Sequence, residues 1–390
     1  MTLDTFRAEV RACLAAVYPL RDGRADDDRS DILVRTPDGH AVHVARARTL
    51  QRMLADAGLV GVTVPEEYGG RGLTTAHAAI LEEELTRFDT PSRRPLGIGP
   101  TLALPTILRV GTEAQKRRYV PPLLAGEELW CQLFSEPDAG SDLASLRTRA
   151  VREGAHWVVD GQKVWSSFAL DASFGLLLAR TDPAAPRPQA GVTMFVLPMD
   201  TPGVRIRPLV DIAGGRHFNE VFLERVLLPA DATLGDLNGG WAVSSGTLGG
   251  ERAGYLGGSG GGRRRRQVSD AAARHRRLGD PVIRQRLVSV IAGEWLLERL
   301  RDRLEAGTVA GGHPAAGSLM KLAAGNLEQE VAALLCDLGG PASAAWPATD
   351  PDGDVAAHAL ATSRQATIAG GTHQIQRNLA GERILGLPRG

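Results

Sequence analysis

The chain has 390 residues, of which 43% are hydrophobic and 23% charged, and its formal net charge is zero. This balance is typical of a globular protein with two or three domains, and it lacks the basic excess of nucleic-acid-binding proteins. Three widely spaced cysteines, Cys13, Cys131 and Cys336, argue against a disulfide framework and against a structural zinc site.

The first residues and the apolar runs of the sequence do not predict an export signal or a membrane span. Charges interrupt the apolar positions of the first 20 residues, so they lack the layout of a signal peptide. No uninterrupted apolar run is long enough to span a bilayer. We therefore expect a cytoplasmic protein.

The first predicted domain, residues 1–128, is helical. Its apolar residues recur at helical spacing, for example at Ile80, Leu81 and Leu85. Thr112 and Gln115 have the spacing of a capping box, which predicts that a helix begins there.

The second predicted domain, residues 129–237, consists of short strands. Asp160-Gly161 is a typical hairpin dipeptide, so it predicts a turn between strands 156–159 and 162–165. Further strands are expected at 174–179, 192–198, 204–208 and 220–228. This number of strands favours a compact β-barrel or sandwich.

The third predicted domain, residues 238–390, is helical again, with long amphipathic segments at 282–304 and 315–338. The glycine-rich run 257–262 predicts a break or a loose helix, because each glycine costs about 1 kcal/mol inside a helix. Close packing against a neighbouring helix or subunit is the alternative explanation. The arginines at 263–266 that follow are interpreted as a solvated face, with an acidic carrier-protein surface as the alternative partner.

The segment Gln132–Trp165 has the composition of a site for a flat cofactor. A Ser-Glu-Pro turn at 135–137 and the small-residue loop 139–142 precede a strand that ends in Lys163-Val164-Trp165. Hydroxyl and backbone N–H groups bond the polar edge of a ring system, while an indole covers its face.

This segment resembles the flavin-binding signature of the acyl-CoA dehydrogenase family, and five further landmarks agree in order. The six matching segments are Pro65–Gly72, Gly111–Gly126, Gln132–Trp165, Phe218–Pro229, Gly239–Trp241 and Ile368–Pro388. The resemblance implies an α+β multidomain fold. Its parts are an N-terminal all-α domain, a middle β-barrel or sandwich and a C-terminal four-helix bundle.

The resemblance also implies FAD as cofactor. Gln132, Phe134 and Ser135 match positions that line the isoalloxazine ring. Trp165 and Ser167 match positions that pack on the flavin and bond it. For an isolated serine or tryptophan, a turn hydroxyl or a half-buried barrel residue is the alternative interpretation.

Other family positions are expected to contact the rest of the cofactor or the substrate. Gly140 and Ser141 match positions that reach the cofactor or the pantetheine arm of the substrate, and Thr372 and Gln374 match contacts with the ribityl or adenine part. Gly339 and Gly340 match a glycine pair near the pyrophosphate of a neighbouring subunit's flavin. For the arginine that meets the pyrophosphate, the candidates are Arg274 and Arg277, with a solvated charge cluster as the alternative.

The family reaction needs a carboxylate that removes the α-proton of an acyl thioester. Many members carry it directly before the Gly-Thr pair of the tail, where this chain has Gly370. A subset, which includes isovaleryl-CoA and long-chain acyl-CoA dehydrogenases, places the base on an earlier helix in a Leu-x-x-Glu-Arg setting. Leu248–Arg252 match that setting, so we expect Glu251 to be the catalytic base and Arg252 to bind substrate phosphate or support the site.

The predicted function is therefore α,β-desaturation of an acyl-CoA thioester by an oxidoreductase of fatty acid metabolism. The resemblance implies an electron-transfer flavoprotein as electron acceptor and a homotetramer or homodimer; no metal, nucleic acid or membrane is expected. Three alternatives remain: a dehydrogenase acting on a carrier-protein thioester, a flavin monooxygenase of the same fold, and a non-catalytic partner subunit in which Glu251 and Arg252 form a surface pair.

Overall fold

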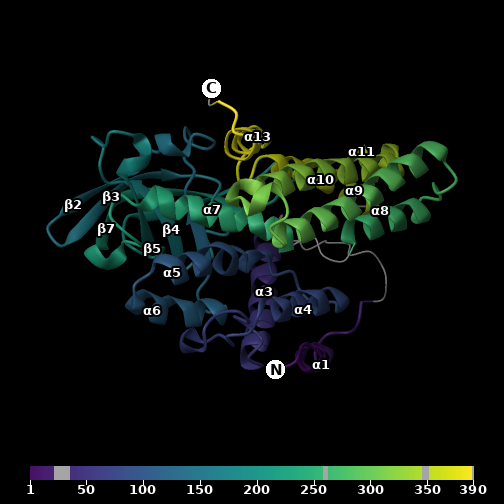
Figure 1. Cartoon of the computed structure of the whole chain (residues 1–390), viewed down its shortest axis with the longest axis horizontal. Helices are drawn as coiled ribbons and strands as arrows, with labels where there is room; N and C mark the ends of the chain where they lie inside the picture. The colour runs from purple at the N-terminus through teal and green to yellow at the C-terminus, as the bar shows by residue number, and fades with distance from the viewer. Residues whose placement is uncertain (22–35, 258–261, 345–350, 389–390) are drawn as a thin grey trace. The chain divides into compact units, whose positions relative to one another are not determined.

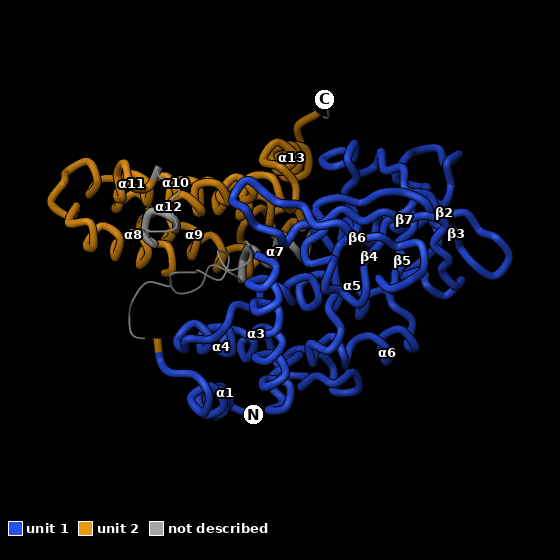
Figure 2. The backbone as a smooth tube through the Cα atoms, turned by 180° about the vertical axis from the view of Figure 1, so that it is seen from behind, with its two compact units in different colours: residues 1–20, 33–250 blue, residues 21–32, 251–390 orange. Residues whose placement is uncertain are grey.

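We analysed a computed structural model of the chain, which describes residues 1–21, 36–257, 262–344 and 351–388. It divides into two compact units (Figure 2). The first comprises Met1–Leu20 and Leu33–Gly250, and the second comprises Arg21–Ile32 and Glu251–Gly390. The predicted domain boundaries at 128 and 237 stay predictions.

Helices come first in the first unit, as predicted (Figure 1). They are α1 (Leu3–Ala15), α3 (Pro37–Asp56), α4 (Thr75–Arg87), α5 (Leu104–Val110) and α6 (Glu113–Leu124). The capping box that begins α6 is confirmed: the Gln115 backbone N–H donates to the Thr112 hydroxyl at 3.2 Å, and the Thr112 N–H donates to Gln115 Oε1 at 3.0 Å. The Gln115 amide also donates to the carbonyls of Asp231 and Thr233, so it fastens α6 to the end of the sheet region.

The middle of the chain forms one seven-stranded sheet in the order β1-β4-β2-β3-β7-β6, with β5 paired to β4. Its strands are β1 (Trp130–Leu133), β2 (Arg149–Glu153), β3 (His156–Lys163), β4 (Phe174–Arg180), β5 (Val192–Pro198), β6 (Val204–Leu209) and β7 (Phe218–Pro229). The strands β1 and β4 run parallel, whereas β7 pairs antiparallel with β3 on one side and with β6 on the other. The sheet buries apolar side chains in two core clusters, one shared with helices α5 and α6 and one formed by the sheet region itself.

The predicted hairpin at Asp160-Gly161 is wrong. β3 is continuous from His156 to Lys163, and its pairing with β7 shifts register between Val159 and Gly161. Gly161 lies at a bulge, and a Cβ atom there would be 2.7 Å from Thr148 Cα. A glycine is therefore needed because the backbone passes close to Thr148, and not because the chain turns there. The real turn lies at 154–155, between β2 and β3, where Gly154 has a φ of 61°.

The second unit is a helical bundle built from α8 (Arg263–Arg274), α9 (Pro281–Glu305), α10 (Gly317–Gly339) and α12 (Pro351–Thr362). The two long predicted amphipathic segments are confirmed as α9 and α10. The preceding helix α7 (Gly240–Gly257) ends where the glycine-rich run predicts a break, and residues 258–261 lie outside the described part. The tail continues through α13 (His373–Leu379).

Candidate functional site

Ser135 and Val164, which are 29 positions apart in the sequence, meet at the end of β3. Gln132 lies on β1, and Ser135 follows that strand. The Val164 N–H donates to the Ser135 carbonyl at 3.0 Å, which brings Ser135 beside the residue that precedes Trp165. The structure thus brings together the two halves of the predicted segment.

Trp165 projects from this junction in an unusual conformation. Its φ is 61°, and its side chain is 59% exposed although its ring meets Phe218 edge-on at 5.7 Å. The side-chain amide of Asn219 donates to the carbonyls of Ser166 and His217, and the Ser166 N–H donates to the Asn219 carbonyl. Asn219 therefore holds the turn that presents the indole, a role that the sequence pattern does not signal.

Phe134 lies in the core beside this junction. Its side chain is 4% exposed and packs in the core cluster shared by the sheet and the helices. The predicted contact of this ring with the flavin stays a prediction. What Phe134 offers the junction is its carbonyl, which accepts a hydrogen bond from Lys163 Nζ at 3.0 Å.

The loop with Gly140 and Ser141 is exposed at both positions. It is turned by reciprocal backbone hydrogen bonds between Glu136 and Ala139. A Cβ atom at Gly140 would meet nothing within 4 Å, so the described residues do not themselves require a glycine there. The predicted reason, close approach to cofactor or substrate, stays a prediction.

A buried ion pair links this loop to β3. Lys163 Nζ lies 2.8 Å from Glu136 Oε1, and the Lys163 side chain is fully buried. Burial lowers the pKa of Lys163 to about 8, although the Glu136 charge opposes that shift. Burial alone would raise the pKa of Glu136, but the Lys163 charge and hydrogen bonds from Lys163, Thr148 and Arg147 outweigh it and place that pKa below its ordinary value.

The junction fits the flat cofactor that the resemblance implies. The exposed indole of Trp165 offers an apolar face. Ser167 follows it two residues later in the chain, and the Ser135 carbonyl is bonded by the N–H of Val164, the residue before Trp165. Two buried atoms near it, Ser166 Oγ and Asn219 Oδ1, have no hydrogen-bond partner among the described residues. A polar ring edge is a group of the kind that satisfies such atoms.

The candidate base lies on a helix whose first half is firmly attached. Glu251 and Arg252 belong to α7, but the side chains of 249–257 lie outside the described residues. One turn before Glu251, the Thr247 hydroxyl bonds that of Thr106 on α5 at 2.7 Å. Arg109 donates to the Val243 carbonyl at 2.9 Å, which adds a second link between α5 and α7.

In the tail, Thr372 caps α13 by accepting a hydrogen bond from the Ile375 N–H. Gly370 and Gly371 have φ values of 67° and 97°, a left-handed backbone that glycine adopts without strain. The buried Gln376 amide donates to both of their carbonyls and fixes this turn. Gln374 is exposed beside it.

The residues predicted to contact the pyrophosphate differ in their surroundings. Arg277 is engaged by Asp280, at 2.8 Å, whereas Arg274 is exposed in the last turn of α8. Gly340 ends α10 with a φ of 62°, and its N–H donates to the Cys336 carbonyl. That N–H is therefore already bonded within the chain. At Gly339 the lack of a side chain matters, because a Cβ atom there would lie 1.9 Å from Ser343 Oγ.

The arginine run is part of the bundle rather than a simple solvated face. Arg264 pairs with Glu328 at 2.8 Å, and Arg265 lies 3.5 Å from Glu298. The backbone N–H groups of Arg264 and Arg265 donate to the buried carboxylate of Glu294, which caps the start of α8. These contacts engage two of the four arginines that a carrier-protein surface would meet.

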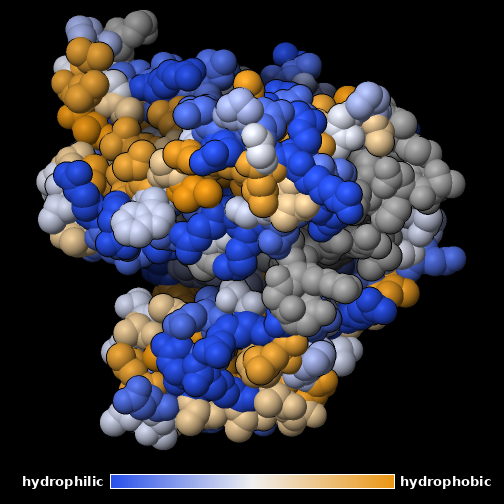
Figure 3. Space-filling model, turned by 90° about the vertical axis from the view of Figure 1, so that its right-hand side faces the viewer, coloured by the Kyte–Doolittle hydropathy of each residue, from blue (hydrophilic) through white to orange (hydrophobic). Residues whose placement is uncertain are grey.

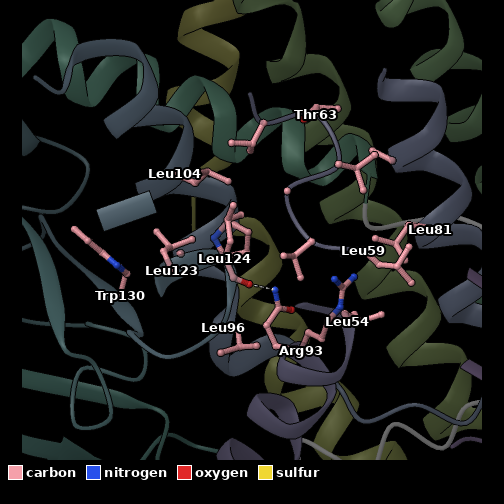
Figure 4. A pocket seen from close by; sticks show the side chains of 18 of the residues that line it. Leu54, Leu59, Thr63, Leu81, Arg93, Leu96, Leu104, Leu123, Leu124 and Trp130 are labelled. Carbon is pink, nitrogen blue, oxygen red and sulfur yellow. Dashed lines mark hydrogen bonds between the residues drawn. The ribbon is translucent and has the colours of Figure 1, made fainter. Parts of the chain in front are cut away.

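A cavity of about 180 Å³ lies among the N-terminal helices (Figure 4). Leucines such as Leu54, Leu59 and Leu123 line it, with Arg93 as a charged member and a hydrogen bond from the Gln51 amide to the Leu124 carbonyl at its wall. No predicted site residue lines it. A second pocket, of about 240 Å³, lies beside the 136–148 loop.

The described residues contain no group of three or more His, Cys, Asp or Glu side chains arranged to hold a metal ion. Within them, no helix combines the length and the apolar character needed to cross a membrane.

The chain matches three family models in succession. They are described as acyl-CoA dehydrogenase N-terminal domain at residues 34–127, middle domain at 131–226 and C-terminal domain at 238–385. Acyl-CoA dehydrogenase IpdE1 of Mycobacterium tuberculosis is 37% identical over 99% of this chain and 98% of the relative. Acyl-CoA dehydrogenase FadE34 of the same species is 41% identical over 87% of this chain and 46% of the relative.

Solved structures agree with these relatives. The Tcur3481-Tcur3483 steroid ACAD superposes with a TM-score of 0.82 at 28% identity, covering 100% of this chain and 98% of that chain. The ChsE4-ChsE5 complex from Mycobacterium tuberculosis gives 0.77 at 26% identity over 100% of this chain and 98% of that chain. The predicted fold class and cofactor are thereby confirmed. The chain belongs to the acyl-CoA dehydrogenase family and is an FAD-dependent acyl-CoA dehydrogenase.

Proposed function

We propose that Glu251 is the base that removes the α-proton of the acyl thioester. The observation that carries this proposal is the combination of Leu248–Arg252 on α7 with a glycine at position 370. Position 370 has no carboxylate because it is a glycine. Its φ of 67° would also strain the backbone of any residue with a side chain at that position. The family's alternative position, on α7, is the one that holds a carboxylate.

The reaction has three requirements that residues of this chain must meet. A carboxylate must accept the α-proton, the thioester must be held with its α-carbon at that carboxylate, and water must be kept away. Bound FAD supplies the acceptor for the β-hydrogen and its electron pair. Ser135, Trp165 and Ser167 would hold the ring, Thr372 and Gln374 the rest of the cofactor, and Ser141 and Arg252 the substrate.

Replacement of Glu251 by glutamine tests the assignment. We expect Glu251→Gln to keep its yellow cofactor and to lose at least about 100-fold in the rate of flavin bleaching by a thioester under anaerobic conditions, the loss typical of a missing general base. Glu305→Gln, which removes an exposed carboxylate at the end of α9, is the matched control. Retained flavin with near-wild-type bleaching in Glu251→Gln would refute the assignment.

For the substrate, we propose a thioester with a bulky, ring-bearing acyl group. The support is the likeness to a structure described as a steroid ACAD, at 28% identity over the full chain. A panel of short, branched, long and ring-bearing thioesters, scored by anaerobic flavin bleaching, tests this. Faster bleaching by short or straight-chain thioesters would instead favour ordinary fatty acid metabolism.

A second candidate is a subunit of a heteromeric dehydrogenase. Two similar solved structures are two-component assemblies by their descriptions. An exposed apolar stripe on α9, formed by Val288, Trp295 and Leu296, offers an interface. Stoichiometric FAD and thioester-dependent bleaching in the purified chain alone would favour the homo-oligomer, a homotetramer or homodimer. Activity that appears only on co-expression would favour the heteromer.

We infer from the family resemblance that an electron-transfer flavoprotein reoxidises the enzyme in the cytoplasm. The oxygenase alternative is separated by comparing anaerobic bleaching with oxygen-dependent product formation.

The carrier-protein alternative is weakened, because Arg264 and Arg265 already form ion pairs with glutamates of the bundle. A direct comparison of CoA and carrier-protein thioesters of one acyl group tests it.

A further inference from the structure

Lys163 and Glu136 are buried charges for which the proton chemistry of the reaction has no use. Lys163 is the last residue of β3, and its ammonium donates to Glu136 Oε1 at 2.8 Å and to the Phe134 carbonyl at 3.0 Å. Both residues have less than a tenth of their surface exposed. We call this pair, with the Phe134 carbonyl, the Glu136–Lys163 clamp.

Glu136 also closes its own loop. Its Oε2 accepts the Arg147 N–H at 2.6 Å, and its Oε1 accepts the Thr148 N–H at 2.9 Å. One carboxylate therefore joins the start of the loop, at 136, to its end, at 147–148, and the loop to β3. Charge-assisted bonds of this kind are short and directional.

Every flavin-contacting segment expected in the first unit is attached to this clamp. Ser135 lies between Phe134 and Glu136, which both bind Lys163. Gly140 and Ser141 lie in the loop that Glu136 closes. Trp165 lies two residues after Lys163, and the Val164 N–H between them bonds the Ser135 carbonyl.

We propose that Glu136 and Lys163 are positioning residues that hold these three segments in the geometry that binds FAD. Net stabilisation does not explain a buried pair, since apolar residues of similar volume often replace such pairs without loss of stability. Apolar replacements would, however, supply no bonds to the carbonyl at 134 or to the N–H groups at 147 and 148. The inference rests on the family's FAD dependence and on the proposed contacts of Ser135 and Trp165.

Four variants separate positioning from stability. Lys163→Met and Glu136→Gln each leave one buried group without its partner, and the double variant Lys163→Met/Glu136→Gln removes both charges. Glu84→Gln is the matched control, because Glu84 is also fully buried and is paired with Arg7 at 2.6 Å and Arg11 at 2.7 Å, between α1 and α4. For each, the Kd of FAD is measured by fluorescence titration of the apoprotein, alongside its Tm and the visible circular dichroism of bound flavin.

We expect both single variants to lower the Tm of the apoprotein and to weaken FAD binding by about tenfold or more, a loss within the range of coupled neighbouring groups. In the double variant the Tm should recover toward the wild-type value while FAD binding stays weak and the dichroism stays altered. Glu84→Gln should lower the Tm and leave the Kd of FAD unchanged.

Recovery of FAD affinity together with Tm in the double variant would show a merely structural role and overturn the proposal. Wild-type Kd values in folded single variants would overturn it too. If the single variants do not fold, the double variant decides, and Glu136→Asp, which keeps the charge on a shorter side chain, should still weaken FAD binding. A wild-type chain without FAD would contradict the cofactor assignment instead.

Discussion

At the scale of single residues, burial decides what a side chain can offer. Phe134 and Ser135 are neighbours that both match family positions, yet the ring of Phe134 is buried in the core while Ser135 lies at the partly exposed junction.

His373 is a buried residue of the tail, beside Thr372. Its Nε2 atom has no hydrogen-bond partner among the described residues.

His373 makes stability depend on pH. Burial, together with the charges of Lys321 and Arg377, lowers its pKa in the folded chain below the ordinary value of 6.5. The folded state therefore binds fewer protons than the unfolded state near pH 6, and stability is lost as pH falls below about 6.5. We expect the Tm of wild type to fall more between pH 7.5 and 5.5 than that of His373→Gln. Equal falls would contradict this, and the exposed His156→Gln is the control.

At the scale of elements, α7 is positioned before it reaches Glu251. Besides the bonds from Thr106 and Arg109, its first residue lies against the sheet: a Cβ atom at Gly240 would be 2.7 Å from the Met194 nitrogen and from the Thr193 carbonyl carbon on β5. These are backbone atoms, which move only with the strand. The Gly239–Trp241 landmark thus marks where a helix begins in contact with β5.

Gly240→Ala should therefore displace the start of α7. We expect a loss of about 1–3 kcal/mol in the free energy of unfolding, the usual cost of overpacking, measured by urea titration. Turnover should fall as well, since the same helix carries the proposed base. Gly279→Ala, where a Cβ atom meets nothing within 4 Å, should leave both unchanged. An unaltered Gly240→Ala enzyme would contradict this account of α7.

At the scale of the whole molecule, one helix has more apolar surface than its bundle covers. The face of α9 with Ile283, Leu287 and Val290 is buried, while Val288, Trp295 and Leu296 are exposed, Trp295 by 58%. Val288 and Trp295 are seven residues apart, so they share a face of the helix. Hydrophobic patches between hydrophilic ones are also visible on the face drawn in Figure 3.

We expect this stripe to be a subunit interface. Trp295→Glu should lower the mass measured by light scattering after size exclusion, because a central aromatic residue often contributes about 2 kcal/mol or more to an interface. Glu305→Gln, on the same helix, should keep the wild-type mass. A mass that Trp295→Glu does not change at any concentration would remove α9 from the interface.

The sequence by itself determined the helix–strand–helix order of the three regions, the start of α6 and the family. These depend on local periodicity, capping residues and motifs that are contiguous in the chain. Only the tertiary structure decided that Asp160-Gly161 is a bulge, that Phe134 is buried, that Arg264 and Arg265 pair inside the bundle, and that Lys163 bonds Glu136. Each of these depends on contacts between residues distant in sequence, for which a local pattern carries no signal.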